Sequence, residues 1–151
     1  MQLASPQERD LDALMTMMED FNRFEAIAWT RAQGEAPLRT LIGDASLGFV
    51  ALARASDDAP PLGYAVVSFG FDLEWGGRDA FLTELYLVPA ARGRRLGATF
   101  LAAVEAKARA HGAHALHLMV RHANAHAQAL YRRAGYTVPD RLFMTKRLSS
   151  G

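Results

Sequence analysis

The residues with the clearest capacity for chemistry lie in one stretch, Phe81 to Phe100, which reads FLTELYLVPAARGRRLGATF. Its apolar start predicts a strand, and a basic turn with glycines then leads into a helical pattern from Leu96 onward. At a helix start the first backbone N–H groups lack intrahelical partners and the helix dipole is positive, so this order of elements forms an anion site. The stretch therefore predicts a phosphate-bearing ligand, because guanidinium groups match phosphate. The basic and glycine residues of the turn are Arg92, Gly93, Arg94, Arg95 and Gly97.

Two common phosphate-binding loops are absent from this stretch. The pattern GxxxxGK[ST] does not occur, which excludes the loop of nucleotide triphosphatases. The dinucleotide pattern GxGxxG is also missing, since only Gly93 and Gly97 stand here. The anion site therefore belongs to another class.

The composition is that of one globular domain, which we expect to span residues 1–151. Half of the sequence is hydrophobic, 22% is charged and the formal net charge is +1, so nothing in the balance favours nucleic acid or an anionic membrane as a partner. The chain has no cysteine, which excludes disulfides, thiolate zinc sites and a cysteine nucleophile. No apolar run approaches the roughly 20 residues of a membrane helix, and the first residues lack a signal-peptide pattern. We expect a cytoplasmic protein.

The remaining elements must position the anion site. Strand-like patterns cover 1–4, 47–54, 62–71, 81–88, 115–120 and 136–148, and helical patterns cover 5–21, 38–43, 96–112 and 124–134. Three successive strands before the basic turn predict an antiparallel meander. Strand, helix, strand and helix after 81 predict a βαβ unit with parallel strands. The expected fold class is therefore α/β, with a mixed sheet and helices on both faces.

Two details of the N-terminal half bear on the site. Ser5, Pro6 and Glu8 have the pattern of a capped helix start, with Ser5 as the cap. The aromatic segment 21–29 either continues this helix or forms a loop that lines a pocket.

A second constellation follows the strand at 115–120, in the segment HLMVRHANAHAQALYRRAGY. Its strand, Asn, small residue, Leu-Tyr and Gly-aromatic order resembles the GNAT acetyltransferases (Gcn5-related N-acetyltransferases). The first stretch resembles their coenzyme loop, (Gln/Arg)-x-x-Gly-x-(Gly/Ala), except that Arg95 stands where the family prefers its middle glycine. The matching residues are Leu87-Val88-Pro89, Arg92 and Gly97, then Leu118 to Val120, Asn124, Ala127, Leu130-Tyr131 and Gly135-Tyr136.

This resemblance implies a GNAT fold in which the strand ending at Val88 splays from the next parallel strand. It also implies acetyl-coenzyme A as cosubstrate, with its pantetheine arm in the gap and with no metal. The implied coenzyme contacts are the backbone of Leu85, Tyr86, Leu87 and Val88, the amides of Arg92, Gly93, Arg94, Arg95, Leu96, Gly97 and Ala98, and the side chains of Asn124 and Tyr131. We expect Arg95 to turn outward toward the coenzyme phosphates.

The implied reaction is direct attack by a primary amine in a ternary complex. Tyr131 would protonate the leaving thiolate, and a phenol with a pKa near 10 suits that task. Glu84 is the candidate base because a carboxylate interrupting an apolar strand needs a partner or a raised pKa. Each side chain also has a plainer interpretation: Glu84 as the solvent-facing residue of a half-buried strand, Tyr131 as core packing, and Asn124 as a helix cap.

Acidic and aromatic residues favour a small cationic amine as acceptor. The candidate acceptor residues are Phe21, Glu25, Asp72, Glu74 and Trp75, although the last three also suit an ordinary turn. A peptide or protein amine remains an alternative acceptor, and a coenzyme A-binding module without turnover remains an alternative function. Pairing into a homodimer through sheet edges or exposed helices is also open.

The five histidines do not predict a metal site. His111, His114 and His117 are spaced by three, but Gly112 ends the helix between the first two, so they cannot share one helical face. No carboxylate cluster completes a ligand set, and surface histidines are the better explanation.

Overall fold

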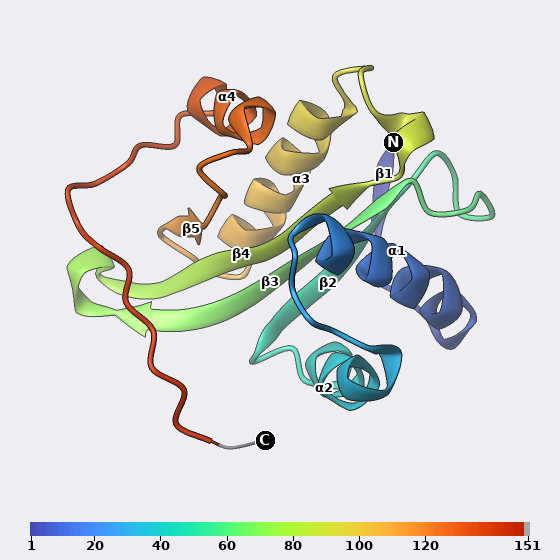
Figure 1. The fold of residues 1–151 in the computed structure, drawn as a ribbon, viewed down its shortest axis with the longest axis horizontal. Coiled ribbons are helices and arrows are strands. Elements are labelled where there is room, and N and C mark those ends of the chain that lie inside the picture. The colour runs from blue at the N-terminus through green and yellow to red at the C-terminus, as the bar shows by residue number, and fades with distance from the viewer. Residues whose placement is uncertain (150–151) are drawn as a thin grey trace.

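The computed structural model describes residues 1–149 and is built around one five-stranded sheet. The strands follow the chain in order: β1 (Gln2–Ala4), β2 (Gly48–Arg54), β3 (Gly63–Asp72), β4 (Gly77–Leu87) and β5 (Leu116–Leu118). The first four strands pair antiparallel, and β5 pairs parallel with β4. The predicted meander and βαβ unit are therefore confirmed, and Figure 1 shows the single mixed sheet that they form.

Helices cover both faces of this sheet. They are α1 (Leu11–Phe24), α2 (Arg31–Gly43), α3 (Leu96–Ala110) and α4 (Ala125–Arg133), with short 3-10 turns η1 (Glu8–Asp10), η2 (Leu73–Trp75) and η3 (Pro89–Ala91). Helices α1 and α2 lie on one face of the sheet, and α3 and α4 lie on the other (Figure 1). None of the helices among residues 1–149 is long and apolar enough to cross a membrane.

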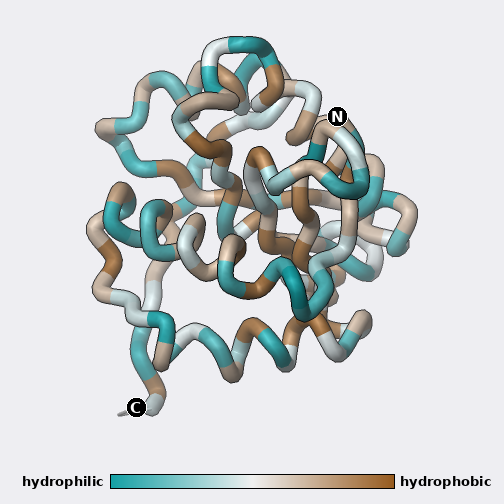
Figure 2. Tube along the Cα trace, turned by 90° about the vertical axis from the view of Figure 1, so that its right-hand side faces the viewer, coloured by the Kyte–Doolittle hydropathy of each residue, from teal (hydrophilic) through white to brown (hydrophobic). Residues whose placement is uncertain are grey.

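Strand β2 is buried on both faces because side chains alternate along it. Phe49 and Ala51 face α3, while Val50 and Leu52 face α1. All seven residues of β2 are buried, which explains its nearly continuous apolar sequence. Figure 2 shows the same pattern, with hydrophobic residues gathered in the central strands and hydrophilic residues interspersed along the surrounding helices.

A buried ion pair fixes the start of α1 to the sheet. Asp10 accepts a hydrogen bond from the Arg54 guanidinium, and both side chains are less than a tenth exposed. Asp10 also accepts from the backbone N–H of Gln7 at 2.9 Å. Burial alone would raise the pKa of Asp10, but these two donors hold it below its usual value. The predicted cap at Ser5 is therefore wrong, because the helical turn begins after Gln7 and uses Asp10.

The C-terminal part departs most from the sequence prediction. Strand β5 has only three residues, which are half-buried, in place of the buried strand expected at 115–120. No strand forms in the described part of the segment expected to hold one at 136–148. Gly135, with φ 95°, turns the chain at the end of α4, and Pro139 offers no N–H to a ladder. The chain then runs in an irregular path past the β3–β4 hairpin (Figure 1).

Candidate functional site

The site is centred on strand β4, which loses its parallel partner partway along its length. Pairing with β5 begins at Ala80 and ends at Leu82. Immediately after, the β3 register shifts so that Val67 faces Leu82 while Val66 faces Glu84, which leaves Thr83 as an extra residue. Such a β-bulge re-aims the side chains that follow it and is common beside active sites. From Glu84 onward, β4 pairs with β3 on one edge and has an open edge on the other.

The open edge carries backbone groups of alternate residues. Val88 donates its N–H to Leu62 O at 2.9 Å, so its amide faces β3. Because N–H groups alternate between the two edges of a strand, the amides of Leu87 and Leu85 point to the open edge. The carbonyl of Val88 accepts from Ala91 N at 2.9 Å. Both backbone groups of Val88 thus have partners within the chain, and the amides of this stretch that remain open are those of Leu85 and Leu87.

The turn after β4 leads directly to the N-terminus of α3. Arg92 folds back onto the strand: its Nε donates to Leu87 O at 2.9 Å, and its guanidinium lies 5.4 Å from the centre of the Tyr86 ring. Arg92 therefore anchors the turn more than it extends toward a ligand. Arg94 and Arg95 are exposed. By helix geometry, the amides of Leu96, Gly97 and Ala98 have no intrahelical acceptor, an arrangement that suits an anion.

Arg95 takes a backbone conformation that L-residues avoid. Its φ is 59° and its ψ is 9°, in the left-handed region, and it makes no side-chain cap to α3. This conformation costs a non-glycine residue roughly 1–2 kcal/mol. The geometry explains why a glycine is preferred at the equivalent place in the motif that the sequence resembles, because glycine takes this conformation without the cost.

Gly97 brings three elements together at the start of α3. A Cβ built at this position would lie 3.6 Å from Leu130 of α4 and 4.0 Å from Leu87 of β4, which are ordinary contacts. The chain itself therefore has room for an alanine at position 97. The absence of a side chain instead leaves the helix end accessible to a ligand.

Glu84 lies on the face of β4 that α1 covers, in line with Tyr86 and beside Tyr64. It is half-buried, so the alternative of a solvent-facing strand residue is wrong. Burial raises the pKa of Glu84 to about 7, and the nearby side-chain amide of Asn22 partly opposes the shift. A carboxyl that is half ionised near neutral pH is suited to general-base catalysis.

Two residues near Glu84 were not predicted from the sequence. Asn22 is buried on α1, and its Nδ2 donates to Met18 O at 2.8 Å. Tyr64 is fully buried, and its hydroxyl has no hydrogen-bond partner among the described residues. Burial raises the pKa of Tyr64, with a further contribution from the charge of Glu84. A signal existed for Asn22, because a polar residue four positions after Met18 falls on the apolar face of α1.

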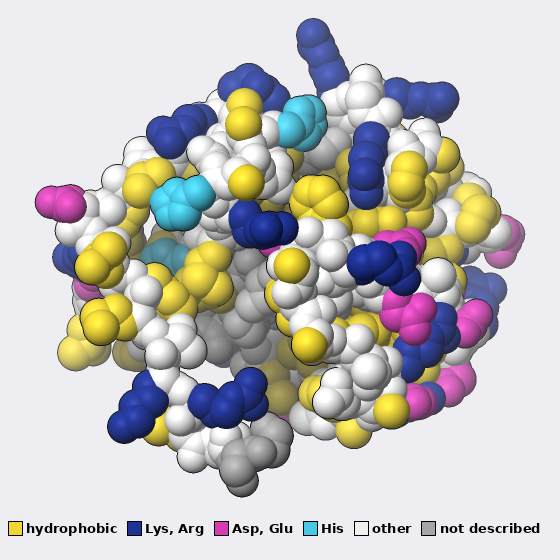
Figure 3. All heavy atoms as spheres, viewed as in Figure 1, with side chains coloured by type: hydrophobic (Ala, Val, Ile, Leu, Met, Phe, Trp, Pro, Cys, Tyr) yellow, Lys and Arg dark blue, Asp and Glu magenta, His cyan; other side chains and the backbone are white. Residues whose placement is uncertain are grey.

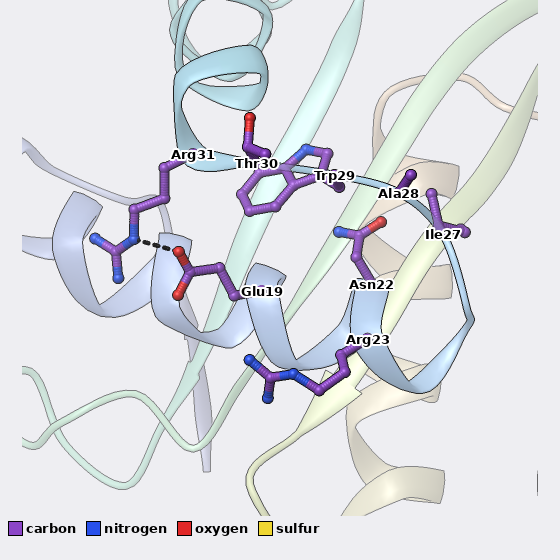
Figure 4. A pocket seen from close by; sticks show the side chains of 8 residues that line it. All are labelled: Glu19, Asn22, Arg23, Ile27, Ala28, Trp29, Thr30 and Arg31. Carbon is purple, nitrogen blue, oxygen red and sulfur yellow. Dashed lines mark hydrogen bonds and ion pairs between the residues drawn. The ribbon is translucent and has the colours of Figure 1, made fainter.

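A cavity of about 420 Å³ lies between α1 and the segment that leads to α2 (Figure 4). Its walls are formed by Glu19, Asn22, Arg23, Ile27, Ala28, Trp29, Thr30 and Arg31. The helix ends at Phe24, so the aromatic segment 21–29 does both things that its sequence allowed: it finishes α1 and then lines a pocket. On one side of the cavity, Arg31 Nε donates a hydrogen bond to Glu19 Oε1 at 2.8 Å. Asn22 connects the cavity to Glu84.

Trp29 forms one wall of the cavity because α2 has no side chain at Gly34. A Cβ at Gly34 would lie 2.1 Å from Cζ2 of the Trp29 indole. The indole therefore rests directly on the helix backbone. The wall depends on this glycine.

Tyr131 approaches the site from α4. It is half-buried, packs on the α3 side of the core and stands edge-on to Tyr136, with ring centres 5.8 Å apart. Burial raises the pKa of Tyr131 to about 12, and the charge of Glu25 adds to the rise. Its phenol is therefore a weaker acid than the ordinary pKa near 10 implies, and it stays protonated at neutral pH.

Asn124 and the loop before α4 hold Tyr131 in place. Asn124 Oδ1 accepts from Ala127 N at 3.1 Å, so the interpretation as a helix cap is confirmed. Arg121 Nη1 donates to Phe24 O at 3.0 Å and ties this loop to the end of α1. The charge of Glu25 reaches Tyr131 from that end of α1, and Ala26 beside it is left-handed with φ 55°. Strained backbone of this kind clusters at functional sites.

Of the other candidate acceptor residues, Phe21 lies near the site but the three of the hairpin do not. Phe21 packs edge-on to Tyr64, with ring centres 6.3 Å apart, as part of the core. Asp72, Glu74 and Trp75 lie at the tip of the β3–β4 hairpin, and by strand geometry Gly77 is already about 24 Å from Glu84. Glu74 there pairs with Arg141 at 2.7 Å. The structure therefore replaces the hairpin tip with the cavity beside Asn22 as the candidate acceptor pocket.

Three of the five histidines have a polar partner within the described structure. His111 Nδ1 contacts Lys107 O at 2.8 Å, and His114 Nδ1 contacts Trp75 O at 2.9 Å. His117 Nε2 lies 3.0 Å from Asp79. Within residues 1–149, no three His, Asp or Glu side chains gather into a set that could hold a metal ion.

Comparison with known proteins agrees with this geometry. A sequence profile described as the acetyltransferase (GNAT) family matches residues 14–136. No curated protein matches the sequence. Among solved structures, an integron cassette protein from the mobile metagenome of Cole Harbour Salt Marsh has a TM-score of 0.83 at 25% identity, covering 99% of this chain and 92% of its own.

Two further solved structures are similar over nearly the whole chain. A candidate acetyltransferase from Arthrobacter sp. FB24 has a TM-score of 0.77 at 29% identity, over 97% of this chain and 94% of its own. An aminoglycoside antibiotic 6′-N-acetyltransferase from Acinetobacter haemolyticus has a TM-score of 0.76 at 16% identity, over 99% of this chain and 100% of its own. The last likeness concerns the fold alone.

Replacing the strained arginine tests the geometry of the turn. Arg95→Gly should raise the free energy of unfolding by about 0.5–1 kcal/mol, because glycine takes a left-handed φ without cost. Urea unfolding measures this, with Arg94→Gly as the control, since Arg94 is not left-handed and should lose stability. Coenzyme affinity should be unchanged or modestly weaker. A clearly tighter complex would mean that the arginine obstructs the loop.

Proposed function

The chain belongs to the GNAT family of acetyltransferases, and we propose that it transfers an acetyl group from acetyl-coenzyme A to the primary amine of a small cationic molecule. The observation that carries the proposal is Glu84: a half-buried carboxyl with a pKa of about 7, placed where β4 parts from β5 and beside a cavity of small-molecule size.

The residues of the chain suit acetyl-coenzyme A. The amides of Leu85 and Leu87 along the open edge can bond an extended amide-bearing arm as a further strand would. The end of α3, uncovered at Gly97, suits a pyrophosphate. When bound, acetyl-coenzyme A supplies an activated acetyl group and a thiolate leaving group.

The chemistry of the chain then has two proton steps. The ammonium loses one proton to solvent before it attacks, and Glu84 accepts, directly or through a water, the second proton that the nitrogen loses as the N–C bond forms. As the new N–C bond forms and the C–S bond breaks, Tyr131 donates its proton to the thiolate, which leaves as the thiol. An amide N–H of β4 directed to the open edge stabilises the negative charge that develops on the acetyl oxygen. Glu84 then releases its proton to solvent, and Tyr131 takes up a proton from solvent. The enzyme therefore ends in its starting protonation state.

Acidic and basic residues are segregated along the chain, as binding of a cationic amine and a polyanionic coenzyme would favour. Up to Glu84 the sequence has six basic and fourteen acidic residues, and after it eleven basic and two acidic. The acidic part builds α1 and α2, and the basic part builds α3 and α4; Figure 3 shows basic side chains along the top of the molecule, over α3 and α4. Such a field draws a polyanionic coenzyme to one side and a cationic amine to the other. In the cavity itself Arg31 is paired with Glu19 and Arg23 with Asp20, so the feature of its wall that favours a cation is the aromatic face of Trp29.

Calorimetric titration with acetyl-coenzyme A is the first test, with Gly97→Asp as the informative variant. The native protein should bind, and the variant should bind at least tenfold more weakly because it places a carboxylate at the helix end proposed to bind the pyrophosphate, while its Cβ meets only ordinary contacts within the chain. Gly43→Asp, where a Cβ meets nothing, is the matched control. Release of free thiol over a panel of polyamines, aminoglycosides and lysine peptides then identifies the acceptor. Absence of binding by the native protein would refute the coenzyme site, and thiol release on peptides alone would refute the small acceptor.

Glu84→Gln should lower kcat by about 10²–10⁴-fold, the usual contribution of a general base. In the native enzyme kcat/KM should rise with pH through about 7 as Glu84 ionises, and the variant should lack this limb. The free energy of unfolding changes in the opposite direction and falls as the pH rises. Because the folded pKa exceeds the unfolded value of 4.5, the native protein loses up to about 3 kcal/mol between pH 4.5 and 7, and the variant does not. Glu35→Gln, on the exposed face of α2, serves as the control. A native pH limb that survives in Glu84→Gln would rule out this base.

Tyr131→Phe tests the acid, and Tyr136→Phe is its matched control. Both remove one hydroxyl from neighbouring rings, but only Tyr131 lies where the leaving group must depart. The Tyr131 variant should lose about 10²-fold or more in kcat with coenzyme affinity retained. Tyr136 has a buried hydroxyl without a partner in the described structure, so its variant should keep full turnover and be at least as stable as the native protein. Equal turnover by Tyr131→Phe and the native enzyme would remove the general acid from the mechanism.

A further inference from the structure

The turn that ends α1 shapes one wall of the cavity. Ile27 N donates to Asn22 O at 2.9 Å and Ala26 N donates to Arg23 O at 3.2 Å, which are the two hydrogen bonds of a Schellman motif. Ala26 occupies the left-handed position of this motif, with φ 55°, where glycine is usual. Asn22, Arg23 and Ile27 all line the cavity, and Figure 4 shows them around this turn. The geometry of the turn therefore sets the shape of the cavity beside Asn22.

One carbonyl of this helix end is bonded from outside the helix. Arg121 Nη1 donates to Phe24 O at 3.0 Å, although the two residues are 97 positions apart in the chain. The last carbonyls of a helix lack intrahelical donors and lie at the negative end of its dipole. A hydrogen bond from a guanidinium to such a carbonyl is charge-assisted and therefore stronger than a neutral one. Arg121 thus attaches the end of α1 to the loop between β5 and α4.

The same residue is fixed to α4 through its backbone. Arg121 O accepts from Asn124 N at 2.9 Å and from Gln128 Nε2 at 3.0 Å. Gln128 lies three residues before Tyr131, so the two side chains are neighbours on one side of α4. Arg121 therefore joins the helix that carries Tyr131 to the turn at the end of α1.

This link crosses the place where the two proposed proton steps must meet. Pairing between β4 and β5 ends at Leu82, and the loop that follows β5 leads from there to α4. Glu84 lies toward α1 on one face of the sheet, and Tyr131 lies toward α3 and α4 on the other. The charge of Glu25, next to Phe24, reaches Tyr131, so this end of α1 lies close to the acid. A base and an acid on opposite faces act on one acetyl group only if the faces keep a fixed separation.

We propose that Arg121 is a positioning residue for acetyl transfer: it fixes the turn after α1, and with it Asn22 and the cavity, relative to Tyr131. This role rests on the acetyl transfer proposed above. The guanidinium of Arg121 is bonded to Phe24 O, so Arg121 acts through the residues that it holds. A plainer role is that of a helix cap, which only stabilises the fold. A cap changes the free energy of unfolding, whereas a positioning residue also changes kcat in fully folded protein.

Steady-state kinetics of Arg121→Ala is the first test. The kcat should fall about 10–100-fold, because a small misplacement of the reacting groups has an effect of this size. The calorimetric Kd for acetyl-coenzyme A should stay unchanged. Arg121→Lys should recover part of the lost kcat, because its ammonium can donate to the same carbonyl. Arg109→Ala removes an equal charge from the exposed far end of α3 and should keep the native kcat. A native kcat in Arg121→Ala would overturn the proposal.

A double variant separates positioning from stability. Ala26→Gly should stabilise the turn, because glycine takes the left-handed φ without strain, and should therefore raise the urea midpoint of Arg121→Ala. In the double variant the midpoint is expected to recover while kcat stays low, with Ala26→Gly alone as the reference. Recovery of kcat together with the midpoint would show that Arg121 acts only as a helix cap, and would overturn its positioning role.

Hydrogen exchange measured residue by residue tests the link without any turnover. In Arg121→Ala the amides of Ala26 and Ile27 should exchange about tenfold faster, because the turn loses its attachment to the loop, and in Arg109→Ala they should not. Absence of thiol release by the native protein would refute the proposed function and this role together. Native turnover with unchanged exchange in Arg121→Ala would refute the role of Arg121 alone.

Discussion

Strand β4 can form backbone hydrogen bonds on two edges, and the rest of the molecule depends on how differently those edges are used. The edge toward β3 is paired along the whole strand, from Gly77 to Leu87. The edge toward β5 is paired only from Ala80 to Leu82. Beyond that point the amides of Leu85 and Leu87 have no strand partner on this edge, and backbone donors need partners in the chain, in water or in a ligand. In the proposed function, an amide-bearing ligand would extend the sheet at this edge.

The bulge at Thr83 couples this backbone feature to the chemistry. Without an extra residue, strict alternation would place residues 82 and 84 on the same face, and Leu82 is in the core beneath α3. The bulge instead turns Glu84 to the α1 face, where Asn22 and Tyr64 surround it. One inserted residue therefore both ends the parallel pairing and moves a carboxyl into a poorly solvated position, and its raised pKa follows from that position.

Most of the fold followed from local patterns, and so did part of the site. The apolar periodicity of α1 and α3, the turn after β4 and the interrupting Glu84 were all visible because each depends on neighbours in sequence. Arg95 was recognised as unusual, but its left-handed backbone was not predictable, since arginine gives no hint of φ. The cavity was only half predicted: the segment before Trp29 suggested a pocket lining, whereas its wall requires Gly34 on another helix. The strand predicted for the C-terminal segment was wrong, because a strand-like pattern does not specify which strand edge would pair with it.

Trp29 and Trp75 are the two tryptophans of the chain, and they lie in two separate regions of the molecule. Trp29 rests on α2 at the wall of the cavity, and Trp75 lies at the hairpin tip beside His117, with ring centres 5.5 Å apart. Their emission therefore has separate origins. With one of them replaced by phenylalanine, the intrinsic fluorescence of the protein becomes a label-free optical reporter of a single event, either occupancy of the cavity or contact at the hairpin. The sequence thus contains a spectroscopic probe for each of these two regions.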